Sequence, residues 1–131
     1  MSETLERETL TFTPAAGSFD VAAIERQAAA CGVGFRDESR PAVFVVAASA
    51  EVRDKLQTDR RAYPDEGFPF TLLIEVTPER VEVGPPYEAA LVPVWRTFIA
   101  WLMRAHPCRV KNEFGTNLTE DAARMSRDGA A

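Results

Sequence analysis

The sequence predicts one domain of the α+β class, a two-layer sandwich in which helices pack against a mixed or antiparallel sheet. Three observations lead to this fold class. Residues 6–12 place Glu8, Leu10 and Phe12 on one side and Arg7, Thr9 and Thr11 on the other, which is typical of a half-buried or edge strand. Residues 42–48, AVFVVAA, form a continuous apolar run and indicate a central strand buried on both faces. Residues 85–105, PPYEAALVPVWRTFIAWLMRA, have the length and apolar spacing of a helix.

Other segments with a clear period complete the expected order of elements. Strands are expected at residues 6–12, 33–35, 42–48, 68–76, 81–83 and 108–114, and helices at residues 19–31, 50–62 and 85–105. This gives the order β-α-β-β-α-β-β-α-β, whose first six elements have the order of a ferredoxin-like start. Residues 1–118 are expected to form the domain, followed over residues 119–131 by a C-terminal helical turn and a disordered tail.

Capping and turn residues define the ends of several elements. Ser18 is the expected N-cap of the first helix, and Gly32 lies where a C-terminal glycine is favoured. Residues 77–80, Thr-Pro-Glu-Arg, place proline where a type I turn prefers it. We therefore expect the strands on either side of this turn to form a hairpin. Pro107 is expected to end the long helix.

The segment at residues 85–105 is more apolar than a helix lying on one sheet needs to be. Its large side chains cover roughly 220° of the helical circumference, whereas a stripe of about 100° is enough for such a helix. Pro93 removes one backbone hydrogen bond, so we expect it to kink or split the helix. The centre of the apolar arc is expected to be core and consists of Leu91, Trp95, Phe98 and Leu102.

Two flanks border this arc, and one sheet does not easily cover both. One flank carries Tyr87, Val94 and Trp101, and the other carries Val92, Ile99 and Met103. Either the bend and the first helix bury the remainder, or one flank forms an interface with another molecule. Tryptophan and methionine are favoured at interfaces, so these six residues are the candidate interface residues.

Composition and charge exclude several functional classes. The 131-residue chain has a net charge of −5, whereas a nucleic-acid binder needs a basic stripe that matches phosphates. The amino terminus, MSETLERETL, has neither the charge pattern nor the apolar run of a signal peptide. No apolar run approaches the ~20 residues that span a bilayer. With two cysteines and no export signal, we expect reduced thiols in a bacterial cytoplasm.

A histidine and a cysteine come close in sequence only at His106-Pro107-Cys108. A nucleophilic cysteine needs a lowered pKa and a base within hydrogen-bond reach, so His106 and Cys108 are the candidate reactive pair. The alternative is a helix-terminal histidine beside a strand cysteine, with Pro107 holding the chain extended between them. Cys31 lies on the apolar face of the first helix, where a thiol behaves as a small hydrophobe.

No metal or cofactor site is predicted. One histidine and two distant cysteines do not have the paired spacing of a zinc site. Gly32-Val33-Gly34 follows a helix, whereas a phosphate-binding glycine loop precedes one.

Two basic clusters have ordinary explanations. In the first, acids alternate with Arg53, Lys55, Arg60 and Arg61, which favours a solvated, ion-paired helix face. The second consists of Arg104, His106, Arg109 and Lys111. On an edge strand, these charges would discourage unwanted strand pairing.

The function that these observations favour is a non-catalytic, bacterial, cytoplasmic protein–protein interaction module, such as an adaptor, a secretion chaperone or an immunity protein. Its partner would be another protein or a second copy in a homodimer. The alternative is a small enzyme or ligand-binding domain with a pocket between the aromatic helix and the sheet, near His106 and Cys108. A subunit of a larger assembly shares the predictions of the first hypothesis.

Overall fold

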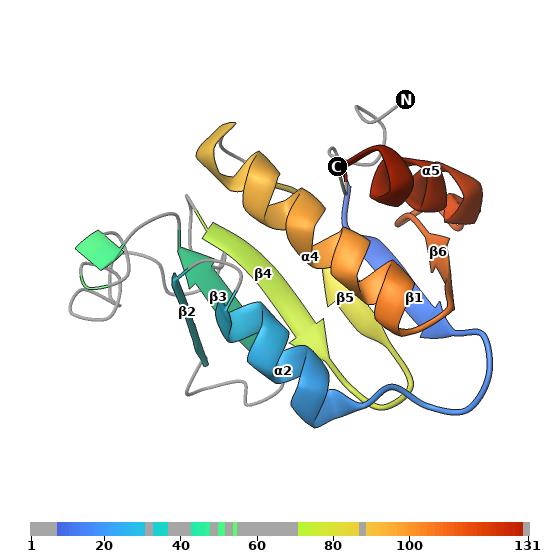
Figure 1. The fold of residues 1–131 in the computed structure, drawn as a ribbon, viewed down its shortest axis with the longest axis horizontal. Helices are drawn as coiled ribbons and strands as arrows, with labels where there is room; N and C mark the ends of the chain where they lie inside the picture. The colour runs from blue at the N-terminus through green and yellow to red at the C-terminus, as the bar shows by residue number, and fades with distance from the viewer. Residues whose placement is uncertain are drawn as a thin grey trace.

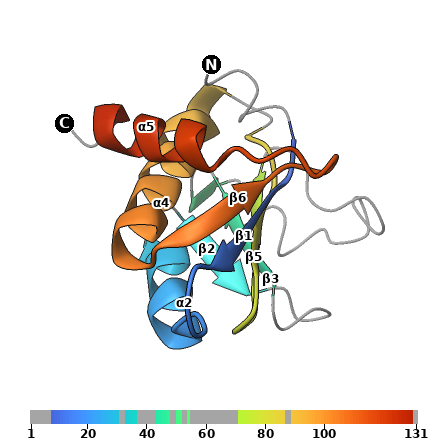
Figure 2. The same cartoon turned by 90° about the vertical axis from the view of Figure 1, so that its right-hand side faces the viewer.

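The computed structural model describes residues 8–30, 33–36, 43–47, 50–51, 54, 71–86 and 89–129. In this part of the chain, one face of a six-stranded sheet is covered by α2, α4 and α5, which confirms the two-layer α+β fold (Figures 1 and 2). None of the described helices has the length and apolar character needed to cross a membrane.

The elements follow the predicted order, with one helix added at the end. They are β1 (Leu10–Pro14), α2 (Val21–Ala30), β2 (Val33–Arg36), β3 (Val43–Ala47), β4 (Thr71–Val76), β5 (Val81–Val83), the 3-10 turn η2 (Ala89–Leu91), α4 (Val92–Ala105), β6 (Cys108–Lys111) and α5 (Thr119–Gly129). The helix predicted over residues 50–62 falls mostly outside the described residues. Ala50, Glu51 and Asp54, which are described, are helical and exposed.

The strands are ordered β2-β3-β4-β5-β1-β6, and each pair of neighbours is antiparallel. β1 therefore lies inside the sheet between β5 and β6, whereas its alternating pattern also suited an edge strand. Three strands separate β1 from β2, so the first elements do not form the closely spaced strand pair of a split β-α-β unit. β3 is buried at all five positions, as its continuous apolar run predicted.

The β4–β5 hairpin forms where the turn residues predicted it. Ile74 pairs with Val83 and Val76 with Val81, and all four side chains are buried. The backbone N–H of Thr77 donates to the carbonyl of Arg80 at 2.8 Å. The Thr77 side chain closes the turn further, because its hydroxyl donates to the same carbonyl at 2.9 Å.

The first helix is capped by Asp20 instead of the predicted Ser18. The carboxylate Oδ1 of Asp20 accepts a hydrogen bond from the backbone N–H of Ala23 at 3.2 Å. The helix begins at Val21, two residues later than expected, because Phe19 leaves the helical path and is buried in the core. Ile24 and Ala28 turn toward the sheet, as their spacing predicted.

The long helix is shorter than the apolar segment that predicted it. A 3-10 turn at Ala89–Leu91 precedes α4, so Pro93 lies in the first helical turn. A backbone N–H there has no partner within the helix, so proline costs no hydrogen bond and no kink is needed. The helix ends at Ala105, before Pro107, as predicted.

The C-terminal segment is a helix of 11 residues, longer than the single turn expected after residue 118. It packs against α4 and β6, and its inward side buries Ala122, Met125 and Ser126. The Ser126 hydroxyl donates to the Ala122 carbonyl at 2.7 Å, which satisfies the one buried polar side chain of this interface. Helix α5 therefore contributes Ala122 and Met125 to the hydrophobic core.

Candidate functional site

The six interface residues predicted on the long helix do not form an exposed apolar surface. Ile99 is fully buried, which corrects its placement at an interface. Trp101, Met103 and Val94 are half-buried and pack against the core cluster. Val92 is also half-buried, and Tyr87 lies outside the described residues.

The reason is that α5 packs on α4 beside the sheet. Ala100, on the polar side of the helical wheel, is only 5% exposed. Helix α4 therefore contacts α2, which was one of the two predicted ways to bury its excess apolar surface, and also α5, which was not predicted as a cover (Figure 1). One protomer therefore covers most of the apolar surface of α4. None of the described large apolar side chains of this helix is fully exposed.

Aromatic contacts join the C-terminal end of α4 to the segment before α2. The Trp101 ring lies 6.4 Å from the Phe98 ring and 6.0 Å from the His106 ring, measured between centroids. His106 in turn meets Phe19 edge-on at 5.7 Å. Such pairs contribute about 0.5–1.5 kcal/mol each beyond area burial. Trp101 and His106 are therefore packing residues at the end of the helical layer.

The candidate reactive pair is not assembled. Cys108 is buried, with its Sγ 3.5 Å from the Sδ of Met103, while the His106 ring contacts Phe19 and Trp101. Burial raises the pKa of Cys108 from 9.0 to about 11. Only about one thiol in ten thousand is then ionised at pH 7, which is the opposite of nucleophile activation. Cys31 lies outside the described residues.

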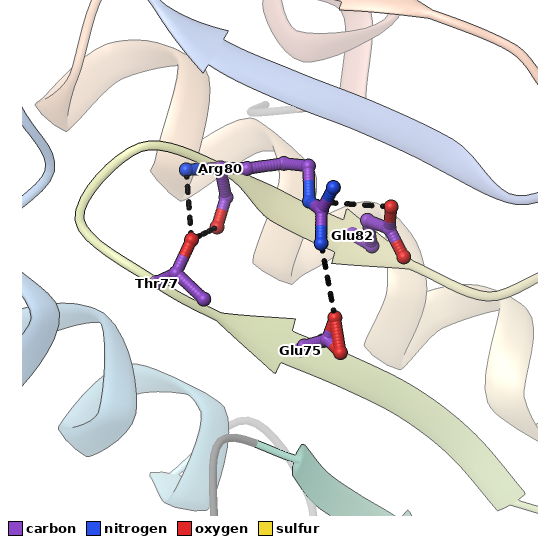
Figure 3. Close-up of polar contacts among 4 residues, drawn as sticks. All are labelled: Glu75, Thr77, Arg80 and Glu82. Atoms are coloured by element: carbon purple, nitrogen blue, oxygen red, sulfur yellow. Dashed lines mark hydrogen bonds and ion pairs between the residues drawn. The ribbon is translucent and has the colours of Figure 1, made fainter.

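The sheet face opposite the helices is polar at its centre. Arg80 holds two glutamates there, with its Nη2 3.5 Å from Oε1 of Glu75 and its Nε 3.3 Å from Oε1 of Glu82 (Figure 3). Glu75 and Glu82 are paired across β4 and β5, so Arg80 offsets the repulsion between two like charges. All three side chains are about one third to one half exposed, which makes this a solvated ion-pair cluster of small energetic value.

The turn between β6 and α5 presents a different surface. Phe114 at its tip is 80% exposed and is the only large hydrophobic side chain that is fully exposed among the described residues. Figure 2 shows this turn extending past β1, away from the helical layer. We call residues 112–117 the Phe114 turn.

Hydrogen bonds from side chains and backbone link the residues of the Phe114 turn to one another and to the segment before β1. The side-chain Oδ1 of Asn112 accepts from the backbone N–H groups of Phe114 and Thr116, both at 2.9 Å. The Asn112 N–H donates to the Thr116 carbonyl at 3.1 Å, and Gly115 has a φ of +81°, which favours glycine. Oε1 of Glu113 accepts from the backbone N–H of Thr9 at 3.0 Å and ties the turn to the segment before β1.

Two basic side chains lie next to this turn on β6. Cys108 and Val110 face the core, so Arg109 and Lys111 project from the opposite face of the strand, and both are exposed. They pair with Thr13 and Thr11 of β1, which add no charge. Among the described residues, neither Arg109 nor Lys111 has an ion-pair partner, unlike Arg80 and Arg124.

The outer edge of β6 is covered where the chain returns from the Phe114 turn. The Val110 N–H donates to the Thr119 hydroxyl at 2.9 Å, and the Val110 carbonyl accepts from the Leu118 N–H at 2.8 Å. A bridge between Lys111 and Asn117 continues this pairing. An added strand would find these backbone groups of β6 already occupied.

Comparisons with known protein families, curated proteins and solved structures found no match to this chain.

Phe114 ends the strand that the sequence predicts over residues 108–114, whereas β6 ends at Lys111. A local signal was present, because Asn112 and Gly115 are turn residues three positions apart. The alternation of buried and exposed residues runs from Cys108 to Lys111. A strand that continued to residue 114 would have to include Asn112, which is a turn residue. The second basic cluster is visible in the sequence, whereas the exposure of its neighbour Phe114 is not.

Proposed function

We propose that this protein is a non-catalytic, cytoplasmic protein-binding module of the kind that includes adaptors, secretion chaperones and immunity proteins. Its contact surface is the Phe114 turn together with Arg109 and Lys111. The observation that carries the proposal is an aromatic side chain that is 80% exposed on a turn held by side-chain and backbone hydrogen bonds.

Burial of an exposed phenylalanine side chain by a partner favours binding, because it removes apolar surface from water. Removing such a side chain from water is worth about 1.5–3 kcal/mol. A turn that is already ordered loses little further conformational entropy on binding, so more of that gain is retained as affinity. Aromatic side chains that fill a partner's pocket are frequent binding hot spots.

The burial of Cys108 gives no support to the reactive pair named for the enzyme alternative. That pair needed an activated Cys108, and burial of that thiol acts against ionisation. A predicted binding flank on α4 is weakened in the same way, because Ile99 is inaccessible and its neighbours are half-buried. The Phe114 turn is the better supported contact surface.

The proposal is tested by affinity capture from a lysate of the native organism with three baits: the natural chain, Phe114→Asp and Thr97→Asp. Thr97 is exposed on α4 and serves as the matched control, because it accepts the same charge far along the chain from the turn. Circular dichroism and thermal unfolding establish that all three baits are folded.

We expect mass spectrometry to identify proteins retained by the natural chain and by Thr97→Asp that are lost from Phe114→Asp. A captured set that is the same for all three baits would overturn the proposed contact surface. Nothing captured by the natural chain would count against a stable protein partner in that organism.

A further inference from the structure

We infer that the partner presents a short acidic segment with at least one apolar side chain, which docks on the Phe114 turn and on the two cations of β6. This inference rests on the proposed function and specifies the chemistry of the partner. Three properties of the surface lead to it: its charge, the state of its strand edge, and its behaviour in a two-fold contact.

Charge is the first property. The chain carries 20 acidic and 15 basic residues, yet Arg109 and Lys111 lie two positions apart on one strand face without an ion-pair partner among the described residues. Glu113 adds one negative charge beside them, but its Oε1 is engaged with the Thr9 N–H. Carboxylates placed over these two cations would complement them without displacing an internal ion pair.

The strand edge is the second property. Because the Val110 N–H and carbonyl are bonded to Thr119 and Leu118, a partner cannot extend the sheet at this position through main-chain hydrogen bonds. Recognition must then depend on side chains. The available groups are an aromatic ring and two cations, so the complementary segment combines an apolar side chain with neighbouring carboxylates.

The third property concerns a second copy of this chain as the occupant. In a two-fold contact the same patch meets itself, so Arg109 and Lys111 of one protomer would approach the same cations of the other. Like charges brought together at an interface disfavour such a contact. This surface is therefore better suited to an acidic partner than to self-association.

Nucleic acid is the remaining class of polyanion. Affinity for a phosphate backbone grows with the number of cations that neutralise phosphates, and this surface supplies two. The net charge of −5 repels a long polyanion as a whole. A short protein segment with a few carboxylates avoids most of that repulsion.

The test uses a random twelve-residue peptide library displayed on phage, selected on the full natural chain in parallel with two variants. Phe114→Asp removes the aromatic side chain, and the double variant Arg109→Glu, Lys111→Glu reverses the local charge. Thr97→Asp is again the matched control. Enriched peptides are then synthesised, and their binding is measured by fluorescence anisotropy at low and at high salt.

We expect the enriched peptides to be acidic with an apolar residue among the carboxylates. Their affinity should fall at least tenfold for Phe114→Asp and for the double variant, stay unchanged for Thr97→Asp, and decrease with salt. The double variant should itself select basic peptides.

Other outcomes separate this inference from the proposed function. Peptides that need Phe114 but are neutral, or that bind the charge-reversed variant equally well, would overturn the acidic partner while leaving the contact surface intact. Peptides that are insensitive to Phe114→Asp, or no enrichment at all, would count against the contact surface itself.

Two further measurements test whether nucleic acid or a second copy of this chain binds the surface instead. Tight binding of a twenty-nucleotide oligo(dT) that the double variant loses would assign the surface to nucleic acid and overturn the inference. A dimer in light scattering that dissociates in Phe114→Asp would assign it to a second copy, with the same consequence.

Discussion

Helix α4 and the Phe114 turn both carry aromatic side chains, but those of α4 are buried or half-buried and that of the turn is exposed. On α4, Trp95 and Phe98 are fully buried and Trp101 is half-buried between ring partners. On the turn, Phe114 is 80% exposed, although the turn around it is otherwise polar. Apolar content along the chain therefore does not predict which aromatic side chains are exposed. What matters is whether neighbouring elements cover the side chain.

The sharpest test of this comparison replaces a phenylalanine by alanine in each region. The larger loss of stability is expected for the replacement in α4. Phe98→Ala removes a fully buried ring and leaves a cavity, so we expect a loss of about 3–5 kcal/mol in the free energy of unfolding. Urea denaturation followed by circular dichroism measures this loss. A cost below about 1 kcal/mol would mean that α4 is less enclosed than the structure shows.

A second test uses the buried thiol beside α4. The unfolded thiol ionises near 9.0 and the folded one near 11, so above pH 9 the unfolded state binds fewer protons and becomes favoured. We expect stability to fall as the pH rises from 9 to 11, by about 2–3 kcal/mol in total. Unfolding free energies measured across this range should fall less steeply in Cys108→Ala. Parallel curves for the two proteins would show that Cys108 is accessible.

The packing of α5 on α4 is tested by Ala122→Leu. Ala122 is completely buried, so the extra atoms force the two helices apart at a cost of about 1–3 kcal/mol. The adjacent Ala123 is half-buried, and Ala123→Leu is the matched control, with an expected change below about 0.5 kcal/mol. Equal effects of the two substitutions on the melting temperature would mean that α5 does not dock as described.

A smaller effect is expected within the turn. Gly115 has a φ of +81°, and a Cβ there would meet no atom within 4 Å, so Gly115→Ala costs only backbone strain. We expect about 1–2 kcal/mol, measured by urea denaturation. Thr116→Ala, whose side chain is exposed, should change stability by less than about 0.5 kcal/mol. A neutral Gly115→Ala would indicate a turn that rearranges easily.

The smallest effect completes the comparison with α4. Phe114→Ala should change the free energy of unfolding by less than about 0.5 kcal/mol, because the ring has few contacts to lose. The same denaturation experiment measures it beside Phe98→Ala. A loss above about 1 kcal/mol would show that Phe114 stabilises the fold and would weaken its assignment to a partner.

Local patterns predicted most of the fold. The hairpin followed from residues 77–80, β3 from its apolar run, and the end of α4 from Pro107. The order of the strands in the sheet could not be predicted from these patterns. A strand such as β1 has the same alternation whether it lies at an edge or in the interior of the sheet. The helix cap was displaced because both Ser18 and Asp20 are good N-caps, and burial of Phe19 decided between them.

The sequence does not predict the proposed contact surface, and the reason is physical. α5 has few apolar residues, and its docking depends on Ala122 and Met125 fitting closely against α4, which periodicity alone does not reveal. A pattern that does not predict the docking of α5 leaves one flank of α4 without a cover. Conversely, exposure of Phe114 results from a hydrogen-bonded turn, and a single phenylalanine beside Gly115 gives no pattern.

The position of β1 has a consequence for how the domain is made. β1 is synthesised before the other described strands, yet its partners are β5 and β6, and the register joins Leu10 to Val83 and Thr11 to Lys111. Each strand in the run β2-β3-β4-β5 pairs with the next strand in sequence. β1 can pair on both sides only after β6 has been synthesised. Until β1 pairs with both β5 and β6, these two strands have no strand between them and the sheet is not continuous. Removing β1 would leave two unpaired edges at the middle of the sheet, where strands of other nascent chains could pair.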